Sequence, residues 1–282
     1  MKESLEEIAV KVDSLDLWRQ FSMCNWAAKV HGFAKPFFCV VLFSHPADIV
    51  KLRLLFIEGW HTFHDFLRLR MDESFGWYTS PMEMKHFEVV YLKDAQPPRI
   101  FKHEPAFVPS PVKGDAEEAI CRKLLWQAFG IMLRLETEGN LGVKYAAEKA
   151  IFSRVEKREG VWEDFPLEIC EAPVHQETVS FPTALLDKAK ALAMDNSFVL
   201  TADFGLLPNV MTKDLRPRTV YQLRVVDTST SQSIVRQMSV PPGGTLRGMW
   251  ESLPARILSI IVELSHVPGE IRMKSKRLYR LM

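Results

Sequence analysis

The chain has 282 residues, of which 47% are hydrophobic, 25% charged and 11% aromatic. This composition is typical of a folded protein with a sizeable core, and it excludes a mostly disordered chain, a collagen-like repeat and a small disulfide scaffold. The 36 basic and 35 acidic residues nearly cancel, so no overall field favours a nucleic acid or a membrane as partner. Because single cores stop growing at about 250–300 residues, this length predicts one large domain or, more often, two.

The sequence carries no targeting signal that we recognise, and we expect a cytoplasmic protein. Its first residues are acidic and lack the apolar segment of a signal peptide. The longest uncharged run, 36–47, is shorter than the ~20 residues of a membrane helix. The four cysteines form no CxxC pair, which excludes a zinc clip and a redox dithiol and is typical of a reducing compartment. They are Cys24, Cys39, Cys121 and Cys170.

Hydrophobic spacing predicts three strands and two helices in the first hundred residues. Alternation of apolar and polar residues indicates strands, and recurrence at intervals of three and four indicates helices. The expected elements are a helix that ends near His31, strands at 37–43, 49–57 and 86–92, and a helix at 60–71.

Five prolines between 97 and 111 predict an extended surface connection, since proline cannot pair in the interior of a sheet. A long helix is expected next, with Asp115 as its cap, Glu118 completing a capping box and its end at Gly139 and Asn140. Between 124 and 135 it is apolar nearly all round, and it is expected to be the buried helix of the first half. A charged hairpin follows, with strands at 151–157 and 161–169.

The second half alternates again between helices and strands. The expected elements are a helix begun by Pro182, strands at 197–202, 219–226 and 233–240, a helix at 246–264 and a strand at 270–274. Pro254 is expected to kink or restart the last helix.

The order of these elements predicts an α+β protein of two domains, each a small mixed or antiparallel sheet packed by helices. Residues 168–178 contain a proline and show no periodicity. We therefore expect an N-terminal domain over 1–168 and a C-terminal domain over 169–282.

Six of the eight histidines lie in the first 103 residues. His61 and His64 are three positions apart on a predicted helix, with Asp65 adjacent, so their rings are candidate ligands for one metal ion. His86 or His103 would supply a third ligand from the next strand or loop. The alternative is an amphipathic helix start with partly exposed imidazoles, because the pair lacks the HExxH spacing and its built-in base.

A glycine-containing turn precedes the last long helix and is a candidate anion site. Backbone N–H groups of Gly243, Gly244 and Thr245 lie at a predicted helix N-terminus, and Arg247 adds charge. The segment is neither a P-loop nor GxGxxG. The alternative is a plain strand-to-helix turn with Thr245 as the cap.

Residues 219–275 have the order strand, strand, helix, strand, with Asp227 on the first strand. This order resembles the start of ribonuclease-H-like nucleases, which need several carboxylates to hold two metal ions. Lys274 and Ser275 stand where such enzymes place a second carboxylate, so the resemblance implies a degenerate, inactive fragment. Asp227 alone is better explained as a turn residue that closes the hairpin.

Charge differs between the halves. Up to Cys170 there are 22 basic and 25 acidic residues, and the remainder holds 14 basic and 10 acidic. Arg272, Lys274 and Arg277 are therefore candidates for contacts with a nucleic-acid backbone. The alternative is an edge strand guarded by cations, since only one aromatic residue, Tyr279, interleaves them.

As a whole the chain resembles bacterial proteins made of two tandem domains of unknown function. In the first half the similarity lies in the 54–59 strand with its following helix and in the 98–109 loop that leads into the 116–135 helix. In the second half it runs from 161–164 through 225–227 to 268–271. The resemblance implies a bacterial, cytoplasmic α+β protein, and it implies no activity, substrate or site.

We expect a non-catalytic protein without a cofactor that binds a protein or small-molecule partner and no membrane, because each catalytic pattern lacks an essential partner. The alternative is a metal-dependent hydrolase with a site near His61 and His64. A third hypothesis is weak nucleic-acid binding by the basic C-terminal half, although a nucleic-acid partner is not the expectation.

Overall fold

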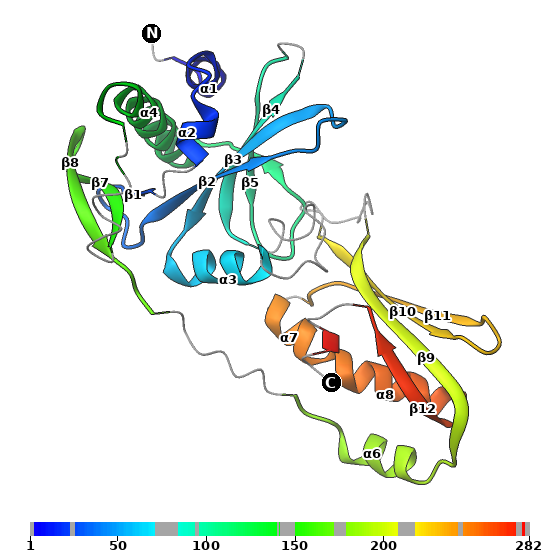
Figure 1. Cartoon of the computed structure of the whole chain (residues 1–282). Coiled ribbons are helices and arrows are strands. Elements are labelled where there is room, and N and C mark those ends of the chain that lie inside the picture. The colour runs from blue at the N-terminus through cyan, green and yellow to red at the C-terminus, as the bar shows by residue number, and fades with distance from the viewer. Residues whose placement is uncertain are drawn as a thin grey trace. The chain divides into compact units, whose positions relative to one another are not determined.

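A computed structural model describes residues 3–22, 26–70, 84–93, 96–139, 141, 150–171, 179–207, 218–241, 245–274 and 278–279. The chain forms two compact units, one of residues 1–67, 84–104 and 109–173 and one of 68–83, 105–108 and 174–282. Each unit has its own sheet, helices and core (Figure 1). The predicted α+β class with two sheets is therefore confirmed. None of the helices in the described ranges combines the length and apolar character that crossing a bilayer requires.

The first unit is built on an eight-stranded mixed sheet with the strand order β6-β5-β4-β3-β2-β1-β7-β8. Neighbours are antiparallel except β1 and β7, which run parallel. Its strands are β1 (Trp26–Lys29), β2 (Phe37–Phe43), β3 (Val50–Glu58), β4 (His86–Leu92), β5 (Arg99–His103), β6 (Ser110–Pro111), β7 (Ala150–Arg158) and β8 (Val161–Glu168). Its helices are α1 (Leu5–Ser14), α2 (Trp18–Ser22), α3 (Trp60–Arg70) and α4 (Asp115–Glu138).

Helices cover both faces of this sheet (Figure 1). The face that carries Cys39 and Phe56 packs against α1, α2 and α4 in one hydrophobic cluster. On the opposite face, the ring of Phe38 stacks on Phe63 of α3 with centroids 4.3 Å apart. Because the central strands are buried on both sides, they are apolar almost throughout, as in the run Phe37–Phe43.

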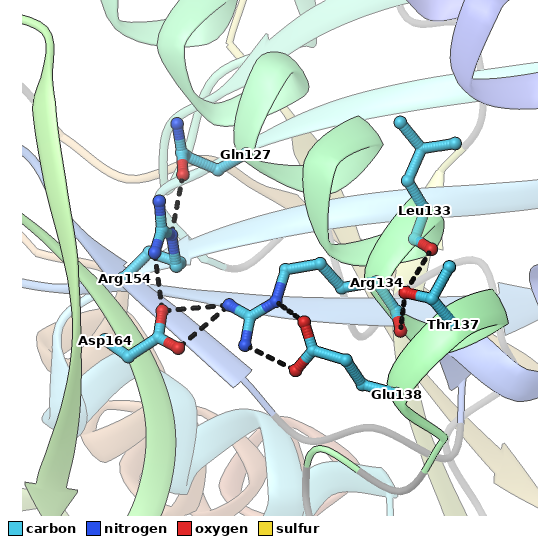
Figure 2. A network of polar contacts seen from close by, with 7 residues as sticks. All are labelled: Gln127, Leu133, Arg134, Thr137, Glu138, Arg154 and Asp164. Carbon is cyan, nitrogen blue, oxygen red and sulfur yellow. Dashed lines mark hydrogen bonds and ion pairs between the residues drawn. The ribbon is translucent and has the colours of Figure 1, made fainter.

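A network of charged side chains joins α4 to the β7–β8 hairpin (Figure 2). Arg134 of α4 forms ion pairs with Glu138 on its own helix, at 2.8 Å, and with Asp164 of β8, at 2.9 Å. Asp164 also pairs with Arg154 of β7, whose Nε donates to Gln127 of α4. Hydrogen bonds from the two arginines outweigh the opposing effect of burial and lower the pKa of Asp164. The hairpin is thereby fixed to the helix through fully partnered groups.

Three predictions in this unit are wrong. The expected helix up to His31 ends earlier, and Trp26–Lys29 is instead strand β1, held between β2 and the distant β7. The connection at 97–111 contains β5 and β6, since the segment between its prolines carries N–H groups that pair with β4. Helix α4 is capped at Gly114, with no side-chain cap, where the sequence predicted Asp115.

The second unit has a four-stranded mixed sheet with the order β11-β10-β9-β12. Strands β9, β10 and β11 form an antiparallel meander, and β12 runs parallel to β9. Its elements are α6 (Thr183–Lys190), β9 (Met194–Leu207), β10 (Val220–Asp227), β11 (Ser233–Met238), α7 (Leu246–Glu251), α8 (Leu253–Leu264) and β12 (Val267–Met273). Helix α8 covers one face through Leu253, Ile257 and Ile260 (Figure 1).

Two residues shape the end of this unit. Pro254 lies in the first turn of α8, where a missing N–H costs no helical bond, so the predicted restart of the helix is confirmed. At Gly269, a Cβ atom would stand 2.7 Å from the Cα of Asn196 on β9. Only glycine allows β12 to approach β9 so closely, and the strand register shifts at this point.

Candidate metal centre

The most unusual polar group of the described residues lies across strands β4 and β5. Residues on β4 alternate, so that Phe87 and Val89 face the core shared with α1 and α4, while His86 and Glu88 face the other side of the sheet. His103 of β5 is the direct cross-strand partner of His86. The antiparallel register therefore places two imidazoles and one carboxylate together.

These three side chains are buried and connected. His86, Glu88 and His103 are each 3% exposed, and the two rings stack with centroids 4.1 Å apart. The Nε2–H of His103 donates to one oxygen of Glu88 at 2.6 Å. Arg53 of β3 donates to the other oxygen at 3.1 Å. Both oxygens of the buried carboxylate thus have a donor.

One nitrogen of His86 has no hydrogen-bond partner among the described residues. Its Nδ1 lies 2.9 Å from the carbonyl oxygen of Met84 and must donate its hydrogen, because a carbonyl only accepts. Burial, and then the neighbouring His103, lower the pKa of His86 from 6.5 to about 3, so the ring is neutral at pH 7. Its Nε2 therefore carries a lone pair, and no described residue donates a hydrogen bond to this buried atom.

Glu88 remains ionised in spite of its burial. Burial raises the pKa of a carboxyl group, but the hydrogen bond from His103 and the charges of His103 and Arg53 outweigh it, and the pKa of Glu88 lies below its ordinary value. A charged carboxylate away from water is stable only when cations or donors surround it. The cluster is thus an anionic oxygen beside a basic, unprotonated nitrogen.

This donor set matches the ligands of a transition-metal ion. One donor atom from each of His86, Glu88 and His103 can be chosen so that all three lie within 4.8 Å of one another. Ligand atoms around tetrahedral zinc lie about 3.3 Å apart, so the three donors would have to move closer together to bind one ion. Two imidazoles and a carboxylate suit Zn²⁺, Co²⁺ or Fe²⁺. The Met84 carbonyl would orient His86 from outside.

The histidines predicted as metal ligands occupy a different place. Nε2 of His61 lies 3.8 Å from Oδ2 of Asp65, one helical turn away, and the His61 side chain is 61% exposed. The ring of His64 stacks on Trp60, and its Nε2 is 2.8 Å from the carbonyl oxygen of Cys170. Within the described ranges, one group of three potential ligands has donor atoms within 4.8 Å of one another, and it includes neither His61 nor His64.

The predicted anion site falls partly outside the described residues, which include neither Gly243 nor Gly244. Thr245 caps α7, and its hydroxyl accepts from the N–H of Gly248 at 3.0 Å. Arg247 forms an ion pair with Glu251 at 2.9 Å. These contacts are those of the alternative interpretation, a strand-to-helix turn with a threonine cap.

The predicted nucleic-acid contacts lie on and after β12. Arg272 is paired with Glu270 at 2.8 Å. Lys274 is exposed and its backbone N–H donates to Ala202. Arg277 lies outside the described residues.

Asp227 closes the β10–β11 hairpin as an Asx turn. Its Oδ1 accepts from the N–H and the hydroxyl of Ser229, at 2.8 and 2.6 Å. Strand β12 pairs with β9, and not with β10, which carries Asp227. The interpretation of Asp227 as a turn residue is therefore confirmed.

Sequence reasoning missed Glu88 and the pairing of His86 with His103. A signal was present, because Glu88 is the one acidic residue in strand 86–92, which is otherwise apolar apart from His86. A charge at such a position needs a buried partner.

We found no match to the chain among protein-family models, curated proteins or solved structures.

Proposed function

We propose that this is a non-catalytic, cytoplasmic metal-binding protein whose first unit holds one zinc-class ion between His86, Glu88 and His103. The observation that carries the proposal is the buried Nε2 of His86, a neutral lone pair to which no residue in the described ranges donates a hydrogen bond. Leaving a buried acceptor unsatisfied costs about 1–3 kcal/mol. A metal ion at this atom would remove that cost.

Burial of the donors supports a binding role rather than a hydrolytic one. Two histidines and a glutamate form the ligand set of some catalytic zinc sites, but such sites keep a fourth position open to water and substrate. All three candidate ligands are almost fully shielded from solvent. An ion at this position would join β4 to β5 and stabilise the sheet by mass action.

Zinc titration of metal-free protein by isothermal calorimetry tests the proposal. We expect one site per chain. His86→Asn should weaken zinc binding by more than about 100-fold, because even partners outside the ligand shell are worth about 10–100-fold. His64→Asn is the matched control, since it removes an imidazole of the other candidate site and should leave the affinity unchanged.

Melting of the metal-free variants shows whether a loss of binding is a loss of fold. If wild-type protein binds no zinc, or if His64→Asn and not His86→Asn abolishes binding, the proposal is wrong. In the second case the site lies near His61 and His64, as the sequence alone suggested.

A further inference from the structure

The second unit contains an apolar cleft between α6, α8 and the strands β9 and β12. Its volume is about 500 Å³, within the range of about 300–1,000 Å³ that is usual for small-molecule sites. The lining is apolar except for Lys190 and includes Leu186, Ala189, Met194 and Leu258.

The cleft is open because the apolar side chains of α6 are not fully buried against α8. Helix α6 has apolar residues along the side that faces α8, yet none of its residues is fully buried. Leu186 and Ala189 of α6 and Leu258 of α8 are only half-buried, and Met194 is 67% exposed. Apolar surface that a core would normally bury is therefore left open in a concave site.

Charge in the lining comes from a single residue. Lys190, in the last turn of α6, is the one ionisable side chain among the lining residues, and it is exposed. The described part of the chain shows no ion pair for it. A long apolar wall with one ammonium group complements a molecule that has an aliphatic chain and one anionic head.

We propose that this cleft binds an unbranched aliphatic monocarboxylate of medium chain length, with the carboxylate at Lys190. The chain would lie against Leu186, Ala189 and Leu258, and the head would stay at the solvent edge of the cleft. The site lies within the second unit and uses no residue of the proposed metal centre, so the two proposals stand or fall separately.

Calorimetric titration of the full chain with hexanoate, octanoate and decanoate tests this inference. We expect saturable 1:1 binding whose affinity rises about fourfold for each added methylene, the increment of burying one such group. Decanol, which lacks the charge, should bind at least several-fold more weakly than decanoate. Affinities that do not change with chain length would overturn the proposal.

Two variants locate the ligand. Ala189→Phe fills the cleft and should abolish binding, while Lys190→Gln should reduce decanoate affinity to that of decanol. Lys188→Gln is the matched control, because Lys188 is exposed on the same helix and does not line the cleft. Equal losses for Lys188→Gln and Lys190→Gln, or full binding by a correctly folded Ala189→Phe, would refute the assignment. Self-association that Ala189→Phe abolishes, without binding of any carboxylate, would show that a second copy fills the cleft and would also refute it.

Discussion

His86 on β4 and His103 on β5 are direct cross-strand partners, and their rings stack with centroids 4.1 Å apart and planes 13° apart. Burial, and then the contact with His103, disfavour the charged form of His86, so this ring is neutral at pH 7. His103 donates to the ionised Glu88. The cluster thus offers an unprotonated imidazole nitrogen and a carboxylate, both of which can bind a metal ion. Without a metal, the positive charge of Arg53 balances the negative charge of Glu88.

Arg53→Gln should increase zinc affinity. The guanidinium pairs with Glu88 at 3.1 Å, so it repels an incoming cation and competes for the carboxylate. Removing one charge at this range in a partly buried site should strengthen binding at least tenfold, about 1.4 kcal/mol. Calorimetric titration measures the change, with Arg99→Gln, an exposed arginine of β5, as control. If the Arg53–Glu88 pair only stabilises the fold, Arg53→Gln should lower stability without increasing zinc affinity.

Glu88→Gln should destabilise the metal-free protein. The substitution removes the buried negative charge that accepts from both Arg53 and His103, and breaking such a pair costs about 3 kcal/mol. Urea unfolding at pH 7 measures the loss. Glu58→Gln is the control, because Glu58 pairs with the half-exposed Lys85, and such pairs are worth about 0–1 kcal/mol. Similar losses of stability in both variants would show that the contacts of Glu88 contribute no more than the Glu58–Lys85 pair.

Glu156→Gln should destabilise the β7–β8 hairpin at neutral pH. The buried carboxylate accepts from the N–H groups of Gly160 and His31 and from the ammonium of Lys123. Hydrogen bonds to a charged group are worth about 1.5–3 kcal/mol. Glu159→Gln is the control, since Glu159 contacts the same lysine but is 79% exposed, and its loss should cost less than about 1 kcal/mol.

The effect of Glu156→Gln should depend on pH. Burial raises the pKa of Glu156, but its three donors lower it by more, so the folded value lies below the ordinary one. A depressed pKa contributes stability above the unfolded value, and that contribution disappears as the pH falls through the folded value. The difference between wild type and variant, measured by urea unfolding, should therefore shrink below about pH 4. A constant difference down to pH 2 would contradict this account.

Asp227 should titrate at low pH. Hydrogen bonds from Ser229 and Thr230 lower its pKa from 3.8 to about 2. The chemical shift of its carboxyl carbon, followed by NMR, should give a midpoint near that value. Ser229→Ala should raise the midpoint toward 3.8. An unshifted midpoint in the wild type would mean that the Asx turn is not formed in solution.

Strands and helices with a strong local period could be predicted from the sequence. The alternation of apolar and polar residues predicts strands β3 and β4, and the proline predicts where helix α8 begins. Strand β1 could not be predicted in this way. It has four residues, and its parallel partner β7 is more than a hundred positions away, so only tertiary pairing makes it a strand.

The candidate site depends on register, which a single sequence does not specify. The sequence shows directly that His61 and His64 are three positions apart on a helix, and this spacing led to the prediction of a metal site at that pair. His86 and His103 are brought together by the β4–β5 pairing, through a segment in which the prolines predicted no strand at all. Glu88 was detectable as a charge inside an apolar strand, but its partners were not.

The central claim is that His86, Glu88 and His103 bind one metal ion, and X-ray absorption at the zinc edge of zinc-loaded protein tests it most directly. The account predicts one zinc per chain with nitrogen and oxygen neighbours at about 2.0–2.2 Å, two of them imidazoles, and no sulfur. It also predicts that the two-imidazole signal is lost in His86→Asn. Zinc that dialyses away from the wild type, or a spectrum unchanged in His86→Asn, would contradict it.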